Sequence, residues 1–104
     1  MDLKGMALNI GVEEEDFVEL LEMLVDVSLT DLASFETELA AGNYNGAAMA
    51  AHSIKGASGN LGLTDISGTA EELEKAAKSS DESQMSEKIM FLKQELGRIS
   101  EALQ

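Results

Sequence analysis

The sequence contains no cysteine and no proline, and aromatic and basic residues are few. Without cysteine the chain can form neither a disulfide framework nor a thiolate metal site. Seven lysines and arginines stand against twenty aspartates and glutamates, which gives a formal net charge of −13. This charge disfavours nucleic acid and anionic membrane surfaces as partners, because both are themselves negative. A protein partner is therefore the expected binding target.

Long apolar runs are also missing. No stretch approaches the length of a membrane-spanning helix, and the N-terminus is too polar for a signal peptide. We therefore expect a cytoplasmic protein. A chain of 104 residues can bury one hydrophobic core but not two. The length predicts a single domain over residues 1–104, and a compact acidic domain of this kind is expected to be monomeric.

What is present favours helices, since alanine, leucine and glutamate are the most frequent residues. Residues 2–10 predict a short N-terminal helical segment. Apolar residues spaced by three and four from Phe17 to Leu39 predict a long amphipathic helix, or two nearly collinear helices broken within residues 28–31. Gly42 is expected to end this helix as its left-handed C′ residue.

Three further helices follow. Asn43 is a typical N-cap for a second helix, which is expected to end at Gly62. Thr64 is expected to cap a third helix, and Asp81 with Gln84 resembles a capping box for the last one.

The apolar spacing also predicts which side chains face the core. In the long first helix they are Phe17, Leu20, Leu21, Leu24, Val25, Ser28, Leu32, Phe35 and Leu39. In the later helices they are Ala47, Ala50, Ala51, Ile54, Ser58, Leu61, Ile66, Ala70, Leu73, Ala77, Met85, Ile89, Leu92, Leu96, Ile99 and Leu103. Four amphipathic helices joined by short loops predict an all-α, antiparallel up-down-up-down four-helix bundle with a short N-terminal helical segment.

The only histidine, His52, lies in an unusual setting. At 100° per residue it points away from the buried stripe of its helix, and its neighbours on that face are Ala48, Lys55, Gly56 and Gly59. A glycine within a helix costs about 1 kcal/mol relative to alanine. Glycine is useful where another molecule must come close. The pattern therefore predicts an exposed docking face around His52.

The chemistry expected of His52 follows from what accompanies it. An imidazole beside a lysine, with no second histidine or cysteine, suggests a nucleophile for phosphate. A di-iron bundle is disfavoured because it needs two Glu-x-x-His pairs. A hydrolase is disfavoured because Ser53 and Ser58 lie on other helix faces. An ordinary surface histidine is the plain alternative.

The motif resembles that of histidine-containing phosphotransfer (HPt) domains of bacterial two-component phosphorelays, and the length and helix order agree over essentially the whole chain. The matching residues are His52, Lys55, Gly56, Ser58, Gly59, Leu61 and Gly62. The resemblance implies that Nε2 of His52 accepts a phosphoryl group from an aspartyl-phosphate receiver domain, or from a histidine kinase, and passes it to another receiver domain. It implies a carrier without catalytic activity of its own and without a bound cofactor or metal, with Mg²⁺ on the receiver partner. A helical adaptor that binds a signalling protein without taking up phosphate is the alternative.

The resemblance also implies roles for other residues. Lys55 is expected to stabilise the phosphoryl group, and Glu74 to hydrogen-bond the other ring nitrogen and raise the basicity of the ring. Lys78 is a candidate second cation, although Glu74–Lys78 and Glu71–Lys75 could equally be ordinary surface ion pairs. The expected partner-docking residues are Ala48, Met49, Gly56 and Gly59. For Gly59, packing against the third helix remains the alternative.

Overall fold

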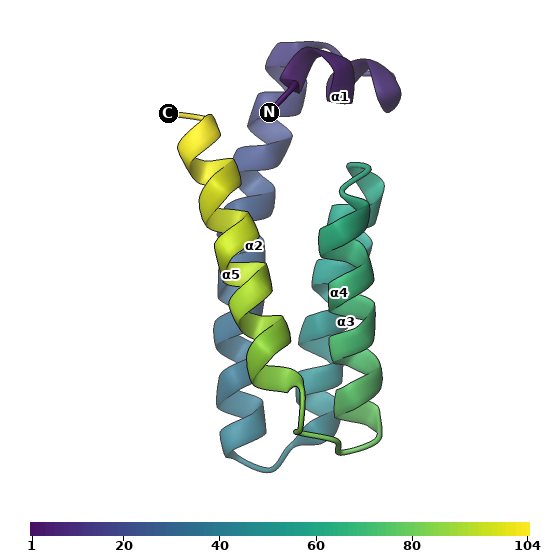
Figure 1. Ribbon diagram of the computed structural model, residues 1–104, viewed down its shortest axis with the longest axis vertical. Coiled ribbons are helices and arrows are strands. Elements are labelled where there is room, and N and C mark those ends of the chain that lie inside the picture. The colour runs from purple at the N-terminus through teal and green to yellow at the C-terminus, as the bar shows by residue number, and fades with distance from the viewer.

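Five helices make up the computed structural model, which describes all 104 residues (Figure 1). They are α1 (Leu3–Asn9), α2 (Glu14–Ala40), α3 (Tyr44–Asn60), α4 (Thr64–Lys78) and α5 (Met85–Ala102). Helices α2 to α5 alternate in direction along the long axis, and α1 lies across one end (Figure 1). The predicted all-α, up-down-up-down four-helix bundle with a short N-terminal helix is confirmed. None of the helices has both the length and the apolar character needed to cross a bilayer.

Helix α2 is continuous, so the alternative of two helices broken within residues 28–31 is wrong. Its first turn carries acidic side chains that complement the partial positive charge of a helix N-terminus. Gly42 follows its end with a φ of +76°, as expected of a C′ glycine. The Asn43 side chain then accepts a hydrogen bond from the Gly46 N–H at 3.0 Å, which confirms the predicted cap of α3.

The two later cap predictions are wrong. Thr64 is already the first residue of α4, and Leu63 takes the N-cap position without a side-chain hydrogen bond. The Asp81 carboxylate accepts hydrogen bonds from both the N–H and the hydroxyl of Ser83. Because this local turn satisfies Asp81, the chain enters α5 only at Met85.

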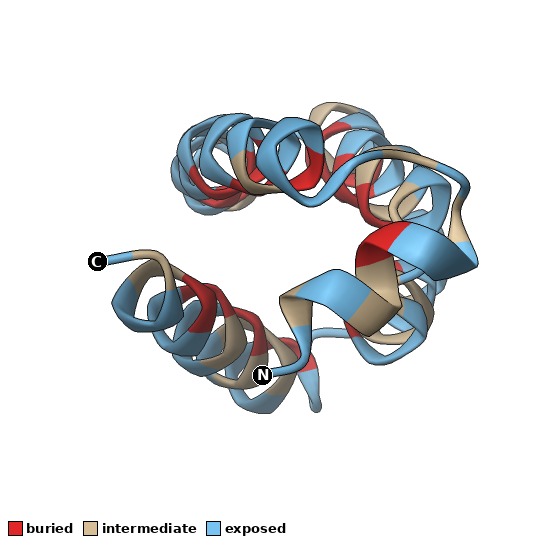
Figure 2. Cartoon of the chain, turned by 90° about the horizontal axis from the view of Figure 1, so that it is seen from above, coloured by how far each residue is buried: buried red, intermediate tan, exposed pale blue.

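The core lies along the inner faces of α2 to α5 (Figure 2). Most of the predicted stripe is buried, and the α4 stripe is buried throughout. Leu20 is the clear exception, with 37% of its surface exposed. Helix α1 buries Ala7 against the bundle, and Ile10 lies 3.5 Å from the position of a Cβ on Gly62, at the turn between α3 and α4.

Helices α3 and α4 pack closely along their length. Ala47, Ala51 and Ala70 are fully buried, and such small side chains allow helix backbones to approach. A Cβ on Gly59 would lie 3.2 Å from Ser67 Oγ, and the Ser67 hydroxyl donates a hydrogen bond to the Lys55 carbonyl at 3.0 Å. This hydrogen bond ties α4 to the turn of α3 that carries Lys55.

Two buried serines in the core differ in their hydrogen bonding. The Ser58 hydroxyl donates to the Ile54 carbonyl at 2.6 Å, whereas the Ser28 hydroxyl has no partner. Removing an unsatisfied buried polar group is stabilising, whereas removing a bonded one costs stability. We expect Ser28→Ala to raise the free energy of unfolding by about 1 kcal/mol and Ser58→Ala to lower it by about 1 kcal/mol. Urea unfolding measures both, and equal losses of stability in the two variants would contradict this account of Ser28.

Candidate functional site

His52 projects from the outer face of α3. Its side chain is 64% exposed, while Ala51 before it and Ile54 after it are fully buried. The prediction that the ring points away from the core is therefore confirmed. The helical periodicity of α3 produces this orientation, since the buried alanines occupy the opposite arc.

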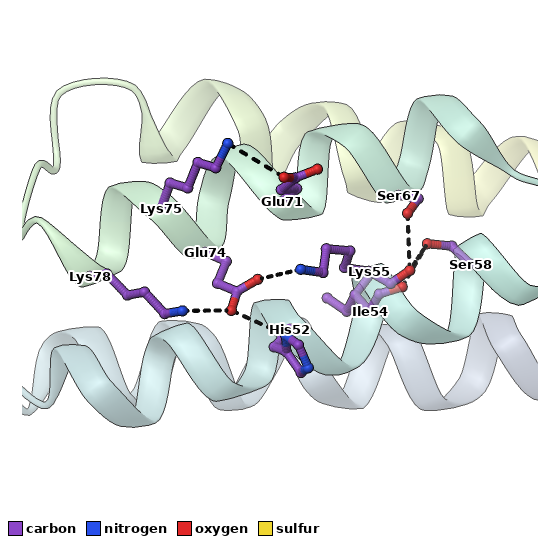
Figure 3. Close-up of polar contacts among 9 residues, drawn as sticks. All are labelled: His52, Ile54, Lys55, Ser58, Ser67, Glu71, Glu74, Lys75 and Lys78. Atoms are coloured by element: carbon purple, nitrogen blue, oxygen red, sulfur yellow. Dashed lines mark hydrogen bonds and ion pairs between the residues drawn. The ribbon is translucent and has the colours of Figure 1, made fainter.

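The Glu74 carboxylate, from α4, contacts three nitrogen atoms, one in the His52 ring and one on each of two lysines (Figure 3). Its Oε2 lies 3.1 Å from His52 Nδ1 and 3.1 Å from Lys78 Nζ, and its Oε1 lies 3.1 Å from Lys55 Nζ. The side chain of Glu74 is only 8% exposed. The carboxylate thus joins one residue of its own helix to two residues of α3. The expected contact between Glu74 and the ring is present.

The charge on Glu74 determines which ring nitrogen carries the proton. Burial by itself raises the pKa of Glu74, but hydrogen bonds from Lys55, Lys78 and His52 outweigh it and lower the pKa from 4.5 to about 2. Glu74 is therefore ionised at neutral pH and can only accept hydrogen bonds. Its contact with Nδ1 requires a proton there, which in a neutral ring leaves the lone pair on the exposed Nε2.

The lysines give this corner of an acidic protein a local excess of positive charge. Lys55 and Lys78 share the single carboxylate of Glu74, so one positive charge is uncompensated within the cluster. Lys78 is well exposed and Lys55 about one-third exposed, so both ammonium groups can reach an anion from solvent. Lys75 instead forms an exposed pair with Glu71 at 3.4 Å, as a simple surface ion pair does.

The four residues predicted to contact a partner have different environments. Met49 and Gly56 are exposed, and a Cβ on Gly56 would meet nothing within 4 Å. Gly59 is exposed at the edge of the α3–α4 contact, where its closeness to Ser67 gives it a packing role as well. Ala48 is only 4% exposed. The prediction that Ala48 lies on the open face is wrong, because α4 packs against the side of α3 that carries Ala48 and Lys55.

The sequence reasoning missed an apolar surface beside this face. Leu20, Met23 and Val27, which we call the α2 strip, are 37%, 62% and 48% exposed. They line a shallow hollow of about 260 Å³ together with Leu24, Ala57, Asn60 and Leu61. The signal in the sequence was the spacing of three and four residues among Leu20, Met23 and Val27, which indicates a second apolar stripe on α2 beside the buried one.

No group of three or more histidine, cysteine, aspartate or glutamate side chains has an arrangement that could hold a metal ion. The polar groups gathered around His52 are one carboxylate and two ammonium groups. Such a set positions an imidazole and attracts an anion.

Comparison with known proteins gives one match. The family model of the Hpt domain matches residues 19–102, which is most of the chain. No curated protein and no solved structure gave a significant match. The matched range includes α3 and α4 complete, and with them His52, Lys55, Glu74 and Lys78.

The Glu74 cluster predicts a pH-dependent contribution to stability. We expect Glu74→Gln to lower the free energy of unfolding at pH 7 by about 1 kcal/mol, because charged hydrogen bonds are lost. The pKa of Glu74 is lowered on folding, so its contribution is complete above about pH 4.5 and is lost as the pH falls toward 2. The difference between wild type and variant should shrink over that range in urea unfolding at a series of pH values.

Glu71→Gln is the matched control for this experiment, since its pair with Lys75 is exposed and contributes little. A difference for Glu74→Gln that stays constant down to pH 2 would contradict the assignment.

Proposed function

The chain belongs to the Hpt domain family, whose members carry phosphoryl groups on a histidine in phosphorelays, and from this premise we propose that His52 is the phosphoryl acceptor. The observation that carries the proposal is the exposed ring whose Nδ1 contacts an ionised carboxylate. In the neutral ring, that contact places the proton on Nδ1 and leaves the lone pair on Nε2, in a side chain that is mostly exposed. His52 is also the only histidine in the chain.

The proposed step needs no proton transfer. The Nε2 lone pair attacks the phosphorus of an aspartyl phosphate on a receiver domain. The N–P bond forms as the P–O bond to the aspartyl carboxyl breaks, and the carboxylate leaves with the bonding pair. Nδ1 keeps its proton, so the phosphorylated ring is an imidazolium, and the Glu74 carboxylate lies against the new positive charge. Onward transfer to a second receiver domain is the reverse sequence.

Lys55 and Lys78 supply the charge stabilisation that phosphoryl transfer depends on. Both ammonium groups lie 3.1 Å from Glu74, on the side of the ring that carries Nδ1. Their flexible side chains can turn from the carboxylate toward phosphoryl oxygens on Nε2. We assign Lys55 as the main phosphate-binding cation, since it is the less exposed of the two, and Lys78 as the second.

The docking partner is a response-regulator receiver domain, a hybrid histidine kinase, or both. Met49, Gly56 and the exposed edge of Gly59 form the surface that lets its active site approach His52. The Mg²⁺ ion belongs to the receiver domain in this proposal, and the chain itself binds no cofactor and turns over no substrate. We place it in the cytoplasm, acting as a monomer.

Labelling tests the proposal directly. Wild-type chain mixed with purified receiver domains, phosphorylated beforehand with radiolabelled acyl phosphate, should gain label that is acid-labile and base-stable. His52→Gln should fold normally and gain none, because no other side chain offers an imidazole. Circular dichroism checks the fold. Label retained in the variant would place the acceptor elsewhere, and a wild-type chain that binds receiver domains without gaining label would be an adaptor.

Gly56 gives a second test. Gly56→Leu should leave the bundle as stable or more stable, because a helix-interior glycine is replaced where space is open. It should slow phosphoryl uptake at least about tenfold by keeping the partner from His52. Gly97→Leu is the matched control, since Gly97 is also helical with nothing within 4 Å of its Cβ position, but lies on α5. Uptake at the wild-type rate by Gly56→Leu would contradict the close-approach role.

A further inference from the structure

The α2 strip is continuous with the face that carries His52. Ser53, which follows His52, donates a hydrogen bond to Asp31 of α2 at 2.7 Å, so these two residues lie at the same level of the bundle. Val27 lies one helical turn beyond Asp31, about 6 Å along the axis, and the strip continues for about 10 Å to Leu20. Asn60 lines the hollow and lies one turn from the exposed Gly56. Gly56 and Asn60 thus lie between His52 and the strip, so a partner placed over His52 is also beside the strip.

The charges that α2 itself places around the strip are all of one sign. Helix α2 contains no lysine or arginine. Asp16, Glu19 and Asp26 are exposed, and each lies three or four residues from Leu20 or Met23. None of them forms an ion pair within the chain. An exposed apolar strip beside unpaired acids is complementary to an apolar surface with basic side chains next to it.

The same charges argue against other occupants. A second copy of this chain would bring its own acids against these and would be repelled, since each copy has a net charge of −13. An anionic membrane surface would be repelled in the same way. The occupant must therefore be a protein with positive charge at the point of contact.

We propose that the α2 strip and its acidic border select the receiver domains that reach His52, by binding an apolar surface bordered by lysine or arginine. That the occupant is a receiver domain rests on the proposed function, whereas its basic character rests on the charges of α2. The apolar contact supplies affinity, and the acids supply the discrimination among receiver domains. The strip acts away from the reacting atoms, so it changes the affinity of docking and leaves the chemical step unchanged.

Binding of unphosphorylated receiver domains tests this inference apart from the chemistry. Each receiver domain of the source organism is titrated into ¹⁵N-labelled chain, both as wild type and as His52→Gln. A receiver domain that binds should shift the amide signals of residues 20–27 in both forms, with affinity that falls as salt is raised. Met23→Gln and the double variant Glu19→Gln with Asp26→Asn should each weaken binding about tenfold. The double variant should also reduce the salt dependence.

The matched control is the double variant Glu87→Gln with Glu101→Gln, which removes the same charge from exposed positions on α5. It should bind within about twofold of wild type, since these acids lie away from the strip. If both double variants weaken binding equally, net charge alone explains the effect, and the proposal that the acidic border selects receiver domains is wrong. Signals that shift only on α5, or binding that is unchanged by the strip variants, would overturn the docking site.

The two proposals fail separately in this design. If the strip variants weaken binding but the wild-type chain gains no label, docking stands and His52 is not the acceptor. If every strip variant binds receiver domains as tightly as wild type and His52 still gains label, the phosphoryl role stands and the docking inference is wrong. If the wild-type chain self-associates or binds anionic vesicles, and Met23→Gln abolishes that binding, the strip has another occupant and the inference is wrong.

Discussion

The arrangement of the site depends on one carboxylate. Glu74 is nearly buried, yet it remains ionised because three N–H donors, from His52, Lys55 and Lys78, surround it. The desolvation of a buried carboxylate is unfavourable unless such partners are present. The partners in turn are held in place by the carboxylate. The contact therefore fixes the tautomer of the ring and the resting positions of both ammonium groups at once.

The packing of α3 and α4 makes this contact possible. Fully buried alanines and the hydrogen bond from Ser67 to the Lys55 carbonyl keep the two helices close enough for a glutamate of α4 to reach a histidine of α3. With larger side chains in the interface, the helices would stand further apart. The small residues of α3 thus act in two ways. The alanines on one arc let neighbouring helices pack closely, and the glycines on the opposite arc leave space around His52.

Helical periodicity in the sequence predicted the all-helical bundle and the outward direction of His52, because both depend on local order within a helix. Caps were predicted less well. Asp81 was expected to begin α5, but its carboxylate is satisfied by Ser83 in a local turn that competes with capping. Of the two alternatives for α2, one long helix or two helices broken within residues 28–31, the structure has the first. Ser28 packs in the core, where tertiary burial outweighs its local preference.

The burial of a side chain that depends on a neighbouring helix could not be predicted from the periodicity of one helix alone. Ala48 shares the outward half of α3 with His52, but α4 covers it, whereas Gly56 stays open. Leu20 has the spacing of a core residue, yet it lies where α2 and α3 leave a hollow. The sequence resemblance implied a contact between Glu74 and the ring, but not that the same carboxylate would hold two lysines. These distinctions depend on how far and at what angle adjacent helices approach.

The His52 cluster is built wholly from α3 and α4, which are neighbours in the chain and joined by the short turn at Gly62. Helix α5 contributes none of the four side chains. The opening of α5 away from the bundle would thus leave the hairpin that holds these groups assembled, with its backbone amides still shielded from solvent. In native-state hydrogen exchange, the amides of α5 would then lose their protons through a partial opening, while those around Ile54 and Leu73 would exchange only when the whole domain unfolds.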